Sequence, residues 1–215
     1  MDSLLLSDYV NLKKVNSIAD LGAGSGIVGI LLAKKFPDAR VSLFEIQEGL
    51  VGLARNNVSL NSLDGRVEVV ACDLRSLPAS DVKGGKYGLV VSNPPFRVMK
   101  SGRISVAEER AIARHEIKLG LCELVDAACF LLRAKGRLCM IYLPGRLSEL
   151  FSVLSDRDCE PKRLRFVHPN RSSEAKMVLV EAVKGGRPGL KAERPFFMYG
   201  EDGGYSSEMA RIYDS

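Results

Sequence analysis

Short apolar runs rich in β-branched residues alternate with longer segments of helical periodicity along most of the chain. Such alternation is typical of βαβ units, which build a parallel sheet. The pattern predicts strands at residues 15–21, 40–44, 67–72, 87–92, 137–143, 162–167 and 176–183, and helices at residues 27–36, 47–61, 107–132 and 147–154. We therefore expect an α/β fold with a seven-stranded, mostly parallel sheet that ends in an antiparallel hairpin. The tail, residues 185–215, is rich in Gly and Pro and is expected to follow the surface, with a short helix near its end.

The length and composition fit one globular unit. The 215 residues, 46% of them hydrophobic, suffice for one well-buried α/β domain and are too few for two ordinary ones, so residues 1–215 are expected to form a single domain. No apolar run approaches the roughly 18 residues that span a bilayer, and Asp2 and Asp8 interrupt any signal-peptide pattern, so a cytoplasmic protein without a membrane partner is expected. Five cysteines without a C-x-x-C pair are expected to be buried free thiols, and two histidines leave no multi-histidine metal site.

The net charge of +5 lies entirely in residues 97–215, where the segments 97–118 and 157–194 concentrate basic side chains. One interpretation is ordinary solvation of exposed helix faces. The other is a basic rim around an active site that receives a polyanion.

A glycine-rich turn joins the first predicted strand to its helix, with the sequence Ala-Asp-Leu-Gly-Ala-Gly-Ser-Gly at residues 19–26. Residues 24–29 fit the dinucleotide pattern G-x-G-x-x-G, but the turn begins at Gly22, two residues after Asp20. An acid there suits a ligand with an ammonium group better than a pyrophosphate. The D-x-G-x-G-x-G frame resembles motif I of class I S-adenosylmethionine-dependent methyltransferases, and the alternative is a turn that serves helix and strand packing only.

Two acidic residues end the next two predicted strands. Glu45 can accept hydrogen bonds from both hydroxyls of a ribose, although an acid at this position is common to NAD enzymes and methyltransferases. In the methyltransferase pattern, an acid at the position of Asp73 bonds the adenine amino group of the cofactor. Either carboxylate could instead cap a helix. The cofactor site implied by this resemblance comprises Asp20, Gly22, Ala23, Gly24, Gly26, Glu45, Ile46, Asp73, Leu74 and Asn93.

The sequence Asn93-Pro94-Pro95-Phe96 follows the fourth predicted strand, at the same sheet edge as the glycine turn. Two consecutive prolines hold the chain extended and donate no N–H, so the Asn93 side-chain oxygen and the Pro94 carbonyl form a rigid row of acceptors. Hydrogen bonds from an exocyclic amine to these acceptors favour a pyramidal nitrogen whose lone pair can attack a methyl group. Phe96 can stack on the target base.

The Asn-Pro-Pro-Phe sequence resembles the [DNS]-P-P-[YFW] motif of amino methyltransferases. Their substrates are adenine N6, cytosine N4, guanine N2 or a glutamine side-chain amide. The motif therefore defines the reaction better than the substrate.

Further elements narrow the resemblance: Ile-Ala-Arg-His-Glu at residues 112–116, His168-Pro169, Asp-Ser-Leu-Leu-Leu at residues 2–6 and Tyr-Ser-Ser-Glu at residues 205–208. Together these resemble the tRNA1(Val) adenine-37 N6-methyltransferase family over nearly the whole chain. The resemblance implies a Rossmann-like class I fold with one antiparallel strand, S-adenosylmethionine as cofactor, and methylation of the adenine beside the anticodon of valine tRNA. Members of that family usually carry an additional segment before the Asp-Ser-Leu-Leu stretch, so a more open site or an upstream start is expected here.

Basic residues near the motif are candidates for contact with RNA. Arg97, Lys100 and Arg103 directly follow the catalytic loop and could contact phosphates, which position a nucleic acid without reading its sequence. Arg114, His115 and His168 are further candidates for substrate binding. For Arg114 and His115 the alternative is pairing with Glu108 or Glu116 along the helix.

Three other functions remain open at this point. An N2-guanine rRNA methyltransferase also favours Asn-Pro-Pro-Phe. A glutamine N5-methyltransferase usually has a helical domain before motif I, for which this chain has only about 17 residues. An RNA-binding module with a vestigial cofactor site is the non-enzymatic alternative.

Overall fold

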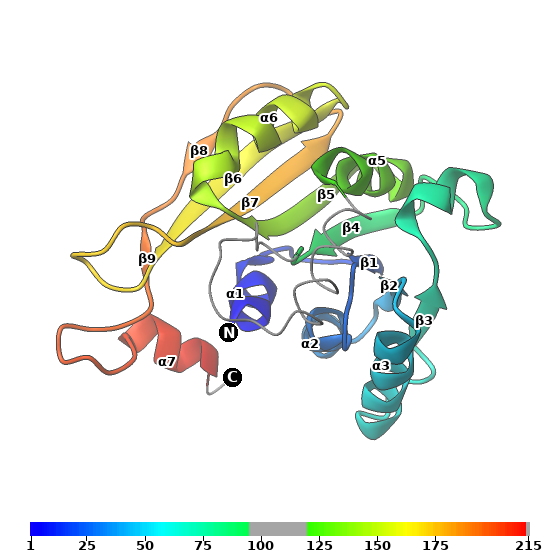
Figure 1. Ribbon diagram of the computed structural model, residues 1–215, viewed down its shortest axis with the longest axis horizontal. Coiled ribbons are helices and arrows are strands. Elements are labelled where there is room, and N and C mark those ends of the chain that lie inside the picture. Colours follow the sequence, from blue (N-terminus) through cyan, green and yellow to red (C-terminus); the bar gives the residue numbers. More distant parts are fainter. Residues whose placement is uncertain (95–119, 214–215) are drawn as a thin grey trace, which may run out of the picture.

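The computed structural model describes residues 1–94 and 120–213, and the described part is built on one nine-stranded sheet (Figure 1). The strands are β1 (Ser17–Leu21), β2 (Arg40–Glu45), β3 (Val67–Ala71), β4 (Tyr87–Ser92), β5 (Leu132–Tyr142), β6 (Cys159–His168), β7 (Met177–Lys184), β8 (Lys191–Ala192) and β9 (Phe196–Phe197). The α-helices are α1 (Asp2–Tyr9), α2 (Ile27–Lys35), α3 (Glu48–Leu60), α5 (Leu121–Leu131), α6 (Leu147–Ser155) and α7 (Ser207–Tyr213). Two 3₁₀ helices, η1 (Leu74–Ala79) and η2 (Pro144–Arg146), complete the described elements.

The sheet order is β3-β2-β1-β4-β5-β7-β6-β8, and β9 also pairs with β6. Strands β1 to β5 pair in parallel, β7 runs antiparallel to both β5 and β6, and β8 and β9 pair in parallel with β6. The expected α/β architecture with a single antiparallel strand is therefore confirmed. The sheet has nine strands rather than seven because the tail adds β8 and β9 to the outer edge of β6. Two residues are too few to show a strand period in the sequence.

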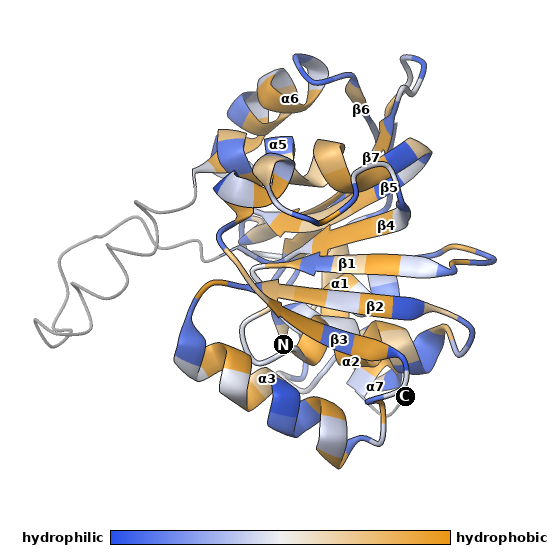
Figure 2. Ribbon diagram, turned by 90° about the vertical axis from the view of Figure 1, so that its right-hand side faces the viewer, coloured by the Kyte–Doolittle hydropathy of each residue, from blue (hydrophilic) through white to orange (hydrophobic). Residues whose placement is uncertain are grey.

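Helices cover both faces of the sheet. On one face, α1, α2, α3 and α7 pack over a cluster of buried residues that includes Leu32, Val58 and Met209. On the other face, η1, α5 and α6 cover a second cluster, to which Leu77 and Leu131 contribute. Figure 2 shows the corresponding pattern, in which the central strands are mostly apolar and α3 turns polar residues outward. This two-sided burial explains why the central strands appear in the sequence as continuous apolar runs.

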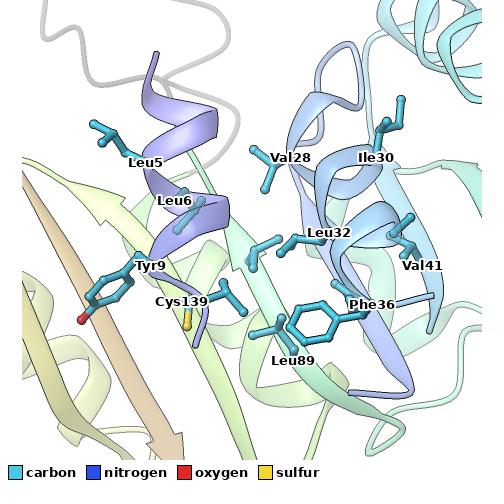
Figure 3. Packing of buried hydrophobic residues seen from close by; sticks show 14 of the residues in the cluster. Leu5, Leu6, Tyr9, Val28, Ile30, Leu32, Phe36, Val41, Leu89 and Cys139 are labelled. Carbon is cyan, nitrogen blue, oxygen red and sulfur yellow. The ribbon is translucent and has the colours of Figure 1, made fainter. Parts of the chain in front are cut away.

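Helix α1 was not among the predicted elements, because its three consecutive leucines show no helical period. Its side chains Leu5, Leu6 and Tyr9 lie against α2 and the sheet (Figure 3). The Arg163 side chain in β6 holds the C-terminal end of α1. Its Nη2 donates a hydrogen bond to the Tyr9 carbonyl at 2.6 Å, and its guanidinium lies 4.0 Å from the centre of the Tyr9 ring. The chain before the glycine turn is thus an integral part of the packed core.

Two predicted strand starts are wrong by three residues or more. The helix predicted at residues 107–132 ends at Leu131, because Leu132 is extended and pairs with Tyr87, so β5 starts five residues earlier than expected. The part of that helix at residues 107–119 lies outside the described residues. Strand β6 starts at Cys159 rather than residue 162, because the sheet accommodates Pro161 through a register shift against β7.

Within residues 1–94 and 120–213, no helix is long and apolar enough to cross a membrane. All five cysteines are free thiols, as expected, but only Cys139 and Cys159 are buried, and Cys122 is exposed.

Candidate cofactor and amine site

The sheet register brings the predicted motifs to one edge. Leu21 pairs with Phe44 on one side and with Ser92 on the other, and Glu45 pairs with Ala71. The glycine turn, Glu45, Asp73 and Asn93 therefore all lie at the carboxyl ends of adjacent parallel strands or within two residues of them. This is the edge at which open α/β sheets bind ligands.

The glycine turn depends on backbone conformations that other residues rarely adopt. Gly22, Gly24 and Gly26 have φ angles of 67°, 56° and 83°. A Cβ atom at Gly22 or Gly24 would meet nothing within 4 Å, whereas one at Gly26 would lie 2.8 Å from Cδ1 of Leu43. Gly26 is thus needed for packing under α2, while Gly22 and Gly24 leave open space above the strand ends.

Asp20 lies beneath this turn, with only 1% of its surface exposed. Its Oδ2 accepts a hydrogen bond from the Gly29 N–H at 2.9 Å. Burial raises the pKa of the Asp20 carboxyl to about 7, the Gly29 hydrogen bond opposes this rise, and the nearby Glu45 carboxylate adds to it. The structure places this acid where it ties strand β1 to helix α2 and shapes the turn from below.

Glu45 is also buried, and backbone groups surround its carboxylate. Oε2 accepts from the Gly24 N–H at 2.8 Å, and Oε1 accepts from the N–H groups of Ile46 and Gln47, each at 2.8 Å. A carboxylate offers about four acceptor positions, so one position on Oε2 remains in this arrangement. Glu45 therefore keeps acceptor capacity on Oε2, and its hydrogen bonds to the ribose hydroxyls stay a prediction.

Asp73 is engaged by its neighbour Arg75. It accepts the Arg75 backbone N–H at 3.0 Å, which makes it the cap of η1, and it also forms an ion pair with the Arg75 side chain. Leu74 is buried in the cluster beneath α5, and the Ile46 side chain is half-buried. The Asp73 carboxylate caps a helix, as one prediction had it, and it also lies at the edge where the other prediction places the cofactor.

The Asn93-Pro94 step continues from β4 beside the glycine turn. The Ser92 hydroxyl, fully buried, donates to the Leu21 carbonyl at 2.9 Å and fastens the end of β4 to that of β1. Asn93 and Pro94 are half-buried at this strand end. The role of the Asn93 amide in binding an amine stays a prediction. The other predicted residues of this region, Pro95, Phe96, Arg97, Lys100, Arg103, Arg114 and His115, lie outside the described residues.

His168 does not lie beside Asn93. It ends β6, three strands away from β4 in the sheet order. Its Nδ1 lies 2.8 Å from the Ser173 carbonyl, and its ring packs against Phe197 with 5.5 Å between ring centres. If His168 contacts substrate, it does so at the outer part of the carboxyl edge rather than at the amine.

Asn57 and Arg75 are two residues of this region that the motifs did not indicate. The Asn57 amide in α3 donates to the Ser25 carbonyl at 2.9 Å and so holds the glycine turn from the outside. The signal in the sequence was weak: an asparagine pair inside a helical segment, where asparagine is unfavourable unless its side chain has a role.

The residues of this edge fit an S-adenosylmethionine molecule. The open space at Gly22 and Gly24 admits a ligand close to the backbone, and the carboxylates of Glu45 and Asp73 stand at the two strand ends beyond it. Within the described residues, no group of three or more His, Cys, Asp or Glu side chains could hold a metal ion.

Comparisons with known proteins agree with this geometry. The chain is 32% identical over 181 residues to the tRNA1(Val) (adenine(37)-N6)-methyltransferase of Porphyromonas gingivalis, covering 79% of this chain and 70% of that protein. It is 26% identical over 212 residues to the enzyme of the same name from Aeromonas hydrophila, covering 98% and 86%. In three dimensions it is similar to the crystal structure of a "predicted O-methyltransferase" from Agrobacterium tumefaciens, with a TM-score of 0.81, 22% identity and coverage of 100% and 96%.

That structural similarity, at 22% identity, concerns the fold alone. The sequence model of the methyltransferase small domain family matches residues 2–142, which include the glycine turn, both strand-end acids and Asn93. The chain therefore belongs to the methyltransferase small domain family and is an S-adenosylmethionine-dependent methyltransferase.

Proposed function

We propose that this protein transfers a methyl group from S-adenosylmethionine to N6 of an adenine in tRNA, at position 37 of tRNA1(Val). The observation that carries the proposal is the Asn93-Pro94 step beside an open glycine turn, in a chain whose relatives bear that activity in their names. We further propose that the whole chain acts as one domain in the cytoplasm, where tRNA is modified.

The cofactor supplies a methyl group on a positively charged sulfur. The cofactor lies close to the backbone at Gly22 and Gly24, where there is open space. Glu45 accepts a hydrogen bond from a ribose hydroxyl through the free position on Oε2. Asp73 accepts a hydrogen bond from the adenine amine of the cofactor once Arg75 releases one of the two carboxylate oxygens. Asp20 acts indirectly, because its bond to Gly29 fixes the turn that the cofactor contacts.

The amine is held by acceptors on this chain. The Asn93 side-chain oxygen and the Pro94 carbonyl each accept one amine proton and draw the nitrogen lone pair out of the ring plane. A side-chain base is not needed, because the nitrogen becomes strongly acidic after transfer and loses its proton to water. Phe96 is proposed to stack on the base, with Arg97, Lys100, Arg103, Arg114 and His115 near the RNA backbone.

Methyl transfer from labelled S-adenosylmethionine to unmodified bulk tRNA, rRNA and a protein extract tests the substrate class. Nucleoside mass spectrometry of the labelled fraction should give N6-methyladenosine in tRNA. N2-methylguanosine in rRNA would instead establish the guanine alternative, and label in protein alone would establish glutamine methylation. Absence of transfer together with absence of cofactor binding in calorimetry would leave an RNA-binding module.

Asn93→Ala tests the role of the amide directly. Removing one preorganised hydrogen-bond partner of the reacting group is expected to lower kcat by about 10²–10³-fold. The Kd for S-adenosylmethionine should remain close to that of the wild type. Asn56→Ala, at an exposed position of α3, is the matched control and should retain full activity. Equal turnover by Asn93→Ala and the wild type would remove Asn93 from the mechanism.

A further inference from the structure

Three exposed tyrosines form a ladder, with two in the turn that joins β9 to α7 and one at the end of α7. The rings of Tyr199 and Tyr205 are stacked with 5.7 Å between centres and 22° between planes, and Tyr213 lies 5.8 Å from Tyr205. Their exposed fractions are 38%, 42% and 60%. Large aromatic rings normally bury their area, so three of them gathered on an exposed turn indicate an interaction surface. In Figure 1 this turn projects from the body of the molecule beside α7.

The backbone under the ladder is firmly held. The Tyr199 N–H donates to the Pro169 carbonyl at 2.8 Å, and Tyr199 and Tyr205 form an isolated antiparallel bridge. The Ser206 hydroxyl donates to the Phe197 carbonyl at 2.6 Å and accepts the Met209 N–H at the start of α7. A ladder fixed in this way loses little conformational freedom when a further ring joins it.

Tyr199 also lines an open cavity of about 630 Å³. Its lining is polar apart from Phe197 and Tyr199, and it includes the hydroxyls of Ser206 and Ser207. None of the described residues that line it is aliphatic, which argues against the apolar anchor of a protein partner. Glu208 at this cavity is held by Arg165 through hydrogen bonds of 2.8 and 2.7 Å, whereas the carboxylates of Glu201 and Asp202 can accept hydrogen bonds from the N–H groups of a nucleobase.

Cations stand at the rim. Arg171 is 77% exposed, lies 3.7 Å from Glu201, and has its guanidinium 6.0 Å from the centre of the Phe197 ring. Arg211 is 70% exposed and lies 3.9 Å from Glu208. Exposed pairs of this length bind weakly, so either guanidinium can turn to a phosphate at little cost.

The ladder lies past the same sheet edge as the candidate amine site. Tyr199 is bonded to Pro169, directly beyond the carboxyl end of β6, and β6 runs in the direction of β4 and β5. Three strand spacings separate β4 from β6, or about 14 Å in the plane of the sheet. About four stacked nucleotides at about 3.4 Å each cover that distance.

We propose that Tyr199, Tyr205 and Tyr213 form a stacking platform for unpaired bases of the RNA substrate, with one base entering the cavity against Tyr199 and the flanking phosphates on Arg171 and Arg211. This inference rests on the proposed function, which supplies a tRNA with a single-stranded loop. Stacking on aromatic side chains is the usual way in which unpaired RNA bases are held.

Binding of fluorescein-labelled 12-residue oligoadenylate and of unmodified bulk tRNA, measured by anisotropy at fixed salt, tests the platform. Base stacking on an aromatic ring contributes about 1–3 kcal/mol, so Tyr199→Ala should weaken oligoadenylate binding by about fivefold or more. Tyr199→Phe keeps the stacking face and should retain the affinity. Leu60→Ala, at a side chain that is 82% exposed on α3, is the control for loss of an exposed apolar group.

A second readout does not depend on how well the alanine variant folds. The chain has six tyrosines and no tryptophan, so its intrinsic emission reports on tyrosine alone. RNA stacked on the ladder should quench this emission, and Tyr199→Phe should lose part of the quench while binding as tightly as the wild type. Unchanged Kd in Tyr199→Ala, or emission that RNA does not quench, would overturn the platform.

Failure of this inference is distinguishable from failure of the proposed function. If the wild type makes N6-methyladenosine in tRNA but Tyr199→Ala binds RNA as tightly as the wild type, the function stands and the platform falls. If the wild type makes no N6-methyladenosine but binds oligoadenylate in a Tyr199-dependent manner, the platform stands on its own.

Discussion

The two halves of the sheet bury carboxylates in opposite ways. At the ends of β1 and β2, Asp20 and Glu45 accept hydrogen bonds only from backbone N–H groups in the described part of the chain. In β7, the Glu181 carboxylate is 4% exposed and forms ion pairs with Arg137 and Arg163. The first arrangement gives the glycine turn its shape, whereas the second fastens strands β5, β6 and β7 together.

This difference indicates that the ends of β1 and β2 serve ligand binding, whereas the carboxylate in β7 serves stability. The backbone-held Glu45 keeps acceptor capacity at the ligand edge, and in the described part of the chain no ion pair engages Asp20 or Glu45. The Glu181 carboxylate is instead held by two arginines, and Arg163 also donates a hydrogen bond to the Tyr9 carbonyl in α1. Substitutions in the two regions should therefore affect different measurements.

Glu181→Ala should have the largest effect on stability. It leaves Arg163, only 17% exposed, without its buried partner, and breaking a buried pair costs about 3–5 kcal/mol in free energy of unfolding. Urea unfolding should show this loss, while the Kd for S-adenosylmethionine of the folded variant stays unchanged. Glu193→Ala removes the weaker 3.3 Å contact to the same arginine and should cost less than about 1 kcal/mol. Equal losses for the two variants would contradict the assigned role of Glu181.

A second comparison, within the glycine turn, separates a glycine needed for packing from one needed for cofactor binding. Gly26→Ala places a Cβ 2.8 Å from Leu43 at a positive φ, and conformational strain plus overpacking should cost about 2–4 kcal/mol. Gly22→Ala has the same kind of backbone strain but open space around it, so it should cost only about 1–2 kcal/mol. Its effect should instead be a tenfold or greater loss of S-adenosylmethionine affinity in calorimetry. If Gly22→Ala binds the cofactor normally, the ligand does not approach the backbone there.

These regions were not equally open to prediction from the sequence. The apolar runs and the turn residues at Gly22 and Asn93 are local signals, so the parallel sheet and the position of the motifs at its carboxyl edge could be predicted. The Arg163–Glu181 pair could not, because its partners approach only after β6 and β7 align. Arg75 was missed for another reason. In the sequence, an aspartate that caps a helix cannot be told from one that binds a ligand, and only the position of the Arg75 side chain shows how Asp73 is engaged.

Asp20 gives a pH-dependent test of the backbone-held group. Its folded pKa of about 7 lies above the ordinary value of 3.8, so between these values the native state binds a proton that the unfolded state has lost. The stability contributed by the neutral carboxyl is therefore lost as pH rises toward 7, and remains low above it. The free energy of unfolding of the wild type relative to Asp20→Asn should fall by up to about 3 kcal/mol between pH 5 and pH 8. Urea titrations of both proteins at four pH values measure this, and a difference that does not vary with pH would refute the raised pKa.

Asn57→Ala should have the smallest effect and gives the finest test of the turn. It removes the 2.9 Å hydrogen bond to the Ser25 carbonyl, a contact that supports the turn without touching the cofactor space. A neutral hydrogen bond contributes about 1 kcal/mol, so the free energy of unfolding should change by about that amount and cofactor affinity by about fivefold or less. Asn56→Ala, the exposed neighbour on the same helix, corrects for the gain in helix propensity. A positioning role requires that Asn57→Ala raise the Kd for S-adenosylmethionine relative to Asn56→Ala while kcat at saturating cofactor stays the same. A fall in kcat at saturation would mean that the turn also orients the reacting methyl group. The turn at Ser25 would then contribute to methyl transfer as well as to cofactor binding.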